Sequence, residues 1–172
     1  GFFFFFSCVC VLQGDQMLKS KLWIWIPLAL LALYGLALIV VALISRRPGS
    51  LGVDDGRLAP CPDSPNCVST QSDDAQHGMA PLSYESTAAE AQQRLLAIVE
   101  AMPRTRIIET TPTYIYAEFR TPTFRFVDDV EFYIDEASSM IHFRSASRLG
   151  YSDMGLNRRR MEEIVRAFED RS

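Results

Sequence analysis

The stretch that decides the fold is residues 124–147, FRFVDDVEFYIDEASSMIHFRSAS, in which two strand-like runs flank a polar turn. Apolar and polar residues alternate within both runs, as in strands that turn one face toward a core. An antiparallel hairpin predicts four cross-strand pairs: Ile134–Ile141, Phe132–Phe143, Tyr133–His142 and Glu131–Arg144. This register is favoured because the apolar pairs share one face, while the opposite charges of Glu131 and Arg144 meet on the other.

Further strands and two helices extend this pattern outward from the hairpin. The predicted strands are residues 105–110, 113–120, 124–134 and 139–147, and residues 81–84 are compatible with another short strand. Before them, Thr87 and Glu90 form the capping box of a helix that Pro103 ends. After them, a last helix begins near Met154. This order predicts an α+β fold, a two-layer domain with a four-stranded antiparallel sheet and two helices on one face.

An uncharged apolar run occupies residues 22–44, LWIWIPLALLALYGLALIVVALI. A helix of about 20 apolar residues crosses the roughly 30 Å core of a bilayer, so we expect residues 17–45 to be a single-pass transmembrane anchor. A cleaved secretory signal fits less well, because its apolar region is about 7–15 residues long and ends at a small-residue site. We expect residues 1–16 to be an erroneous extension of the gene before the true start at Met17.

Two cysteines flank a short loop with two prolines, Cys61-Pro-Asp-Ser-Pro-Asn-Cys67, which follows a predicted linker at residues 46–60. A stiff loop of this length can bring two Cβ atoms to disulfide distance. Free or redox-active thiols and a metal site stay open as alternatives. Since a disulfide implies an oxidising compartment, we expect the soluble domain, residues 61–172, to lie in the periplasm. Two arginines directly after the apolar run slightly favour the opposite orientation.

The charge and the motifs limit the classes of partner. The net charge is −4, whereas a protein that binds nucleic acid without sequence preference needs a basic stripe, so we expect no nucleic-acid partner. No glycine-rich nucleotide motif and no zinc-protease motif occurs, so we predict no cofactor. Two histidines and four cysteines leave few ligands for a metal ion, and we predict none.

An arginine-rich segment, residues 143–160, runs from a strand end through a glycine-containing turn into the last helix. Arginines near a helix N-terminus oppose the helix dipole, so a negative group must offset them. An external anion is one such group, and an anionic small molecule, a glycan or a lipid head group would then bind here. The candidate ligand-binding residues are Arg144, Ser145, Ser147, Arg148, Asp153, Asn157 and Arg158. Ser152 or Asp153 is expected to be the N-cap of the helix.

The internal alternative is a set of carboxylates on the neighbouring strand, Asp128, Asp129 and Glu131, which would pin the last helix to the sheet. Strand alternation places Asp128 on the face opposite to the other two acids, which weakens the idea of a shared metal or catalytic site. An enzyme would use Asp129, Glu131, His142 or Arg148 as acid–base or electrophilic groups.

Three motifs occur in order along the soluble part: Cys61-Pro-Asp-Ser-Pro-Asn-Cys67-Val-Ser, Asp128-Asp-Val-Glu-Phe132, and Arg144-Ser-Ala-Ser-Arg148 followed by Gly150-Tyr-Ser-Asp-Met-Gly-Leu-Asn-Arg158. Together they resemble the domain-of-unknown-function family 1499, over about residues 58–170. The resemblance implies a bacterial envelope-type protein with an N-terminal membrane segment or signal, in a family without an established activity. It also implies that the cysteine loop, the acidic strand and the arginine-rich turn belong together, and it supplies no catalytic residue.

We therefore expect a membrane-anchored extracytoplasmic module that binds a ligand or acts as a scaffold through an arginine-rich, anion-attracting surface. Two alternatives stay open. One is an enzyme with acid–base residues on the polar face of the sheet, and the other is a thiol-redox protein that uses Cys61 and Cys67. The sequence identifies no protein partner.

Overall fold

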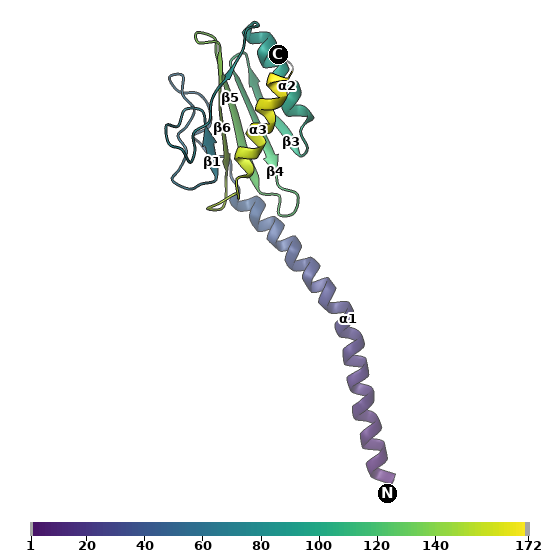
Figure 1. The fold of residues 1–172 in the computed structure, drawn as a ribbon. Coiled ribbons are helices and arrows are strands. Elements are labelled where there is room, and N and C mark those ends of the chain that lie inside the picture. The colour runs from purple at the N-terminus through teal and green to yellow at the C-terminus, as the bar shows by residue number, and fades with distance from the viewer. Residues whose placement is uncertain (1, 171–172) are drawn as a thin grey trace. The chain divides into compact units, whose positions relative to one another are not determined.

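The computed structural model describes the backbone of residues 2–170 and the side chains of residues 23–170 (Figure 1). The chain forms two compact units, Gly1–Val41 and Ala42–Ser172. Helix α1, Phe2–Ile44, contains one segment, Trp23–Ile44, that is long and apolar enough to cross a membrane. Because a signal sequence can have the same length and composition, this segment is a candidate for either a membrane anchor or a signal. The side chains of residues 1–16 lie outside the described part, and the prediction that these residues are an erroneous extension stays a prediction.

The second unit is an α+β domain with one antiparallel sheet. Its elements are β1 (Cys67–Ser69), β2 (Leu82–Ser83), α2 (Ala88–Ala101), β3 (Thr105–Thr111), β4 (Tyr114–Arg120), β5 (Val127–Asp135), β6 (Met140–Ser147) and α3 (Leu156–Glu169). The strand order is β1-β6-β5-β4-β3, and β2 also pairs with β6. The prediction of a four-stranded sheet is wrong, because the sheet has six strands. The two additional strands are three and two residues long, too short to show an alternating pattern.

The central hairpin has the predicted register. Ile134 pairs with Ile141 and Glu131 pairs with Arg144, and the two pairs between them also match. Phe132 and Phe143 are fully buried on the apolar face. Helices α2 and α3 both pack on this face, as Figure 1 shows, and their apolar residues join those of the sheet in one core.

The two helices begin in different ways. Helix α2 has the predicted capping box, in which the Thr87 hydroxyl accepts the Glu90 N–H and the Glu90 carboxylate accepts the Thr87 N–H. Helix α3 begins after Gly155, whose φ of 77° is left-handed, so neither Ser152 nor Asp153 is the N-cap residue. Asp153 still accepts the N–H groups of Gly155 and Asn157, because the left-handed turn folds them back toward its carboxylate.

The other face of the sheet is covered by the segment that was predicted to be a linker. Leu58 is buried against Tyr114 and Tyr116, with Leu51 packed beside them. The Gly52 N–H donates to the carboxylate of Glu131 on β5. Part of residues 46–60 is therefore packed onto this face of the sheet.

A disulfide joins Cys61 and Cys67, with 5.7 Å between their Cα atoms. Cys67 is the first residue of the edge strand β1, which pairs with the end of β6. The disulfide therefore ties the loop before β1 to the edge of the sheet.

Replacing both cysteines with alanine should destabilise the domain by about 2 kcal/mol, because a loop with a sequence separation of 6 is then no longer closed in the unfolded chain. Urea unfolding of the full chain in detergent, followed by circular dichroism, measures this change. The reduced wild-type chain is the matched control and should lose a similar free energy. A double variant as stable as the oxidised wild type would contradict the prediction.

Candidate functional site

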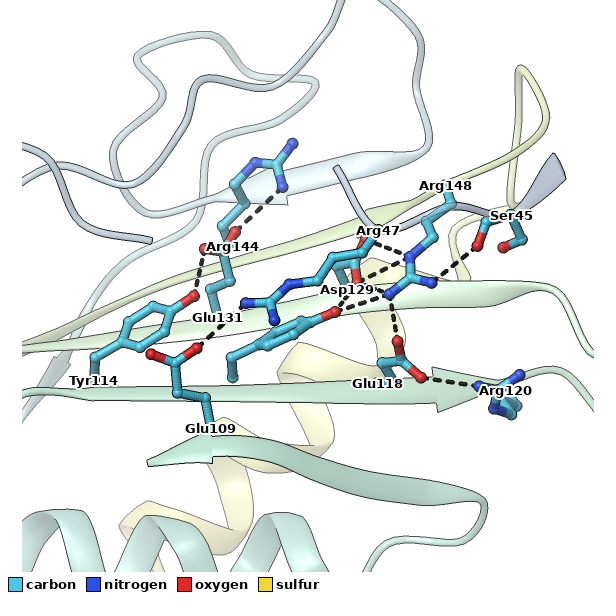
Figure 2. A network of polar contacts seen from close by, with 11 residues as sticks. Ser45, Arg47, Glu109, Tyr114, Glu118, Arg120, Asp129, Glu131, Arg144 and Arg148 are labelled. Atoms are coloured by element: carbon cyan, nitrogen blue, oxygen red, sulfur yellow. Dashed lines mark hydrogen bonds and ion pairs between the residues drawn. The ribbon is translucent and has the colours of Figure 1, made fainter. Parts of the chain in front are cut away.

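The densest polar cluster lies on the sheet face opposite the helices and centres on Arg148 (Figure 2). The Arg148 guanidinium donates to both carboxylate oxygens of Asp129, at 2.9 and 2.7 Å. Its Nη2 also donates to the Tyr116 hydroxyl and the Glu118 carboxylate, and its Nη1 donates to the Ser45 carbonyl. Only 6% of the side chain is exposed, so the charge of Arg148 is neutralised within the protein.

Strand pairing explains why this arginine is needed. Glu118 on β4 and Asp129 on β5 are directly paired, so two carboxylates lie side by side. Burial raises the pKa of Glu118, but hydrogen bonds and charge from Arg148 and from Arg120 outweigh burial and hold the pKa below its usual value. Burial, followed by the hydrogen bond to Asp129, raises the pKa of Tyr116. Tyr116 is therefore a neutral donor between two ionised groups.

A second group surrounds Glu131, whose side chain is fully buried. Its carboxylate accepts from the Tyr114 hydroxyl and the Gly52 N–H, both at 2.8 Å, and from Arg144 at 3.4 Å. Burial and the neighbouring Glu131 charge raise the pKa of Tyr114. The Arg144 Nε is buried without a hydrogen-bond partner among the described residues.

A third group lies on the helix face, where strand alternation places Asp128. Its carboxylate accepts from Arg160 on α3 at 2.7 Å and from the Ser147 hydroxyl at 2.6 Å. The other Arg160 nitrogen donates to the Asn157 amide oxygen, which also accepts from the Ser145 hydroxyl. This network pins α3 to the sheet through Asp128, whereas Asp129 and Glu131 lie on the other face of the sheet.

The sequence-predicted site residues are thus divided between several places. Arg144 and Arg148 lie on one face of the sheet, while Ser145, Ser147 and Asn157 lie on the other. Asp153 holds the first turn of α3, and Arg158 donates to the carbonyls of Gln76 and Gly78. Each of these residues makes internal contacts of the fold, and together they do not form one ligand-facing surface.

Sequence reasoning missed the residues of β4 that bind Arg148 and Glu131. Tyr114, Tyr116 and Glu118 follow one another at a spacing of two in Tyr-Ile-Tyr-Ala-Glu. This spacing puts two phenols and a carboxylate on one face of a strand. The same spacing occurs at Asp129 and Glu131 on the neighbouring strand, so the signal was present in the sequence.

The geometry offers little to an enzyme or to a metal ion. Among the residues with described side chains, no group of three or more His, Cys, Asp or Glu is placed to hold a metal. His142 is half-buried, stacks on Tyr133, and contacts the Thr70 hydroxyl at 3.2 Å, and burial lowers its pKa. Asp129 and Glu131 are occupied by arginine and tyrosine donors.

An open groove of about 580 Å³ lies where α3 crosses the ends of β3 and β4. Its polar lining consists mainly of five arginines and two glutamates: Arg104, Arg120, Arg159, Arg160, Arg166, Glu162 and Glu163. Arg120 pairs with Glu118, and Arg160 pairs with Asp128. Two further arginines of the groove bind backbone carbonyls: Arg104 donates to the Arg120 carbonyl, and Arg159 donates to the Met154 carbonyl. A carbonyl satisfies a donor but leaves the positive charge in place.

A family model described as "Protein of unknown function (DUF1499)" matches residues 57–168. The chain belongs to the DUF1499 family. The DUF1499 match includes the disulfide loop, the carboxylates of all three networks and the groove, while Ser45 and Gly52 precede it. Searches of the curated proteins and of the solved structures found no significant match.

Replacing Arg148 with methionine should cost about 3–5 kcal/mol of folding free energy, because Asp129 would stay buried without its cation and Glu118 would keep only Arg120. Urea unfolding of the full chain measures the loss. Arg106→Met, at an exposed position on the edge strand β3, is the control and should change stability by less than about 0.5 kcal/mol. Equal small effects of both substitutions would show that the network contributes little.

The ion pairs of Glu118 should make stability depend on acidity. Its pKa is lowered in the folded state, so its ionisation stabilises the fold above the ordinary carboxyl pKa, and this contribution is lost as the pH falls through the lowered value. Between pH 7 and pH 3 the wild-type chain should lose more stability than Glu118→Gln, which is less stable at pH 7. Parallel stability curves for the two chains would contradict this prediction.

Proposed function

We propose that this DUF1499 protein is a membrane-anchored extracytoplasmic binding module. Its groove would bind a phosphate carried on a hydroxyl-rich group, such as a polyol phosphate or the head group of an anionic lipid. The observation that carries the proposal is the set of groove arginines whose charge no carboxylate neutralises. Of the ion pairs made by residues 23–170, none involves Arg104, Arg159 or Arg166.

The composition of the groove favours this ligand chemistry. A guanidinium presents its N–H groups in a fork that matches phosphate oxygens. Arg120 and Arg160 already pair with Glu118 and Asp128. The lining of the groove then holds three other arginines and two glutamates. The arginines attract an anion, and the carboxylates of Glu162 and Glu163 accept hydrogen bonds from hydroxyl groups. A bare anion would use only the first of these two features.

The candidate span at Trp23–Ile44 supports the anchor, and the Cys61–Cys67 disulfide supports an oxidising compartment on the far side of the membrane. Nothing described at the same disulfide points to the thiol-redox alternative: Cys67 is buried, and only Cys61 is partly exposed. The enzyme alternative gains no support either, because its acid–base candidates are already bound to internal partners.

Thermal unfolding of the full chain in detergent, with added glycerophosphate, tests the groove. The wild-type chain should be stabilised, and Arg104→Gln with Arg159→Gln should weaken the apparent affinity at least about tenfold, through the loss of charged hydrogen bonds. Arg106→Gln is the matched control, because Arg106 is an exposed arginine directly opposite Glu118 on the neighbouring strand, which places it on the sheet face away from α3 and the groove.

A second arm distinguishes the sources of the phosphate. The same variants are incorporated into phosphatidylcholine nanodiscs with or without phosphatidylglycerol. Stabilisation by phosphatidylglycerol alone would identify a lipid head group, and stabilisation by glycerophosphate would identify a soluble ligand. If neither probe stabilises the wild type more than the double variant, the groove does not bind this class of ligand.

A further inference from the structure

Exposed apolar side chains gather in two loops of the domain. Beyond Ile44, five large apolar side chains are exposed among the described residues. Four of them form what we name the apolar tip: Phe124, Phe126, Tyr151 and Met154. Tyr151 and Met154 are 76% and 87% exposed, although side chains of this size usually pack against a partner. The fifth residue, Val53, lies in the segment that covers the sheet.

The two loops lie at the same end of the sheet. The first connects β4 to β5, and the Thr121 N–H donates to the Phe126 carbonyl across its base. The second follows β6, and its backbone joins the start of β5 through the bond from the Arg148 N–H to the Val127 carbonyl, at 3.0 Å. Figure 1 shows both loops at this end of the domain. The rings of Phe124 and Phe126 are 5.8 Å apart.

The chain enters the domain at this same end. Ser45 is the first residue after the candidate span, and its carbonyl accepts a hydrogen bond from Arg148 Nη1 at 3.1 Å. A span that ends at Ile44 holds Ser45 at the membrane surface. Because Arg148 begins the second loop, the network that buries Arg148 also holds the apolar tip close to the lipid.

The residue types of the tip are those that favour the boundary between water and lipid. Aromatic rings concentrate at the level of the head groups, and methionine and phenylalanine enter the acyl region. Arg125, between the two phenylalanines, and Arg46, next to Ser45, are both exposed and can extend toward lipid phosphates.

We infer that the apolar tip docks on the membrane surface and places Tyr151 in the head-group layer and Phe124 and Phe126 at its boundary with the acyl chains. Lipid is the occupant because the chain connection already fixes this end of the domain at the bilayer. The inference rests on the anchor of the proposed function and does not depend on the ligand of the groove.

Fluorescence quenching by lipid tests this inference. In the full chain with Trp23→Phe and Trp25→Phe, a single tryptophan is introduced as Phe124→Trp, and the protein is reconstituted into phosphatidylcholine vesicles that contain brominated lipid. The Phe124→Trp chain should be quenched several-fold more strongly than the matched Ala137→Trp chain, whose substitution lies in the exposed β5–β6 turn at the opposite end of the sheet.

A second set of variants excludes an effect of the introduced tryptophan itself. In the Tyr151→Trp background, replacing Phe124 and Phe126 with serine should reduce the quenching, whereas Val53→Ser should not. Unchanged quenching in the serine variant would overturn the inference.

Flotation of the vesicles separates the two proposals. A chain that does not float with the vesicles overturns both the anchor and the docking. A chain that floats but shows equal quenching at positions 124 and 137 overturns only the docking.

Discussion

A buried guanidinium between two paired strands is the contact on which the rest of the domain depends. Glu118 and Asp129 are forced together by the pairing of β4 with β5, and their mutual repulsion would separate the strands. Arg148 supplies the positive charge that pairs with both carboxylates inside the fold. Because the same side chain binds the Ser45 carbonyl, the position at which the chain enters the domain is determined by the charges in the middle of the sheet.

The use of arginine inside the fold also determines where binding can occur. Arg148 and Arg144 serve carboxylates on one face of the sheet, and Arg160 serves Asp128 on the other. An arginine-rich sequence is therefore not in itself an anion-binding surface. What matters is which guanidinium groups keep their charge after the internal carboxylates have been satisfied. By this criterion the proposed anion site is the groove beside α3, to which the arginine-rich segment contributes Arg159 and Arg160.

Features that depend on residues close together in the sequence could be predicted from the sequence. The hairpin register follows from strict alternation, and the Thr87 capping box from a spacing of three. Strand β1 could not be predicted, because its three residues gain order only from β6, whereas β2 falls within residues 81–84, for which the sequence indicates a short strand. Likewise, residues 46–60 resemble a linker, since nothing in their composition reveals the tyrosines of β4 that they cover. In the candidate site, alternation predicted the opposed directions of Asp128 and Asp129, but not that both carboxylates are buried.

The contact between Ser45 and Arg148 joins positions that are separated by 103 residues, which has a consequence for the order of events during synthesis. Residues 46–60, which cover the sheet, leave the ribosome before any of its strands, whereas β6 and Arg148 are made late. Until then these residues have no complete sheet to pack on and stay an open chain. The Cys61–Cys67 pair, with a separation of only 6, can close during this interval. The disulfide would then already be closed when β1 pairs with β6.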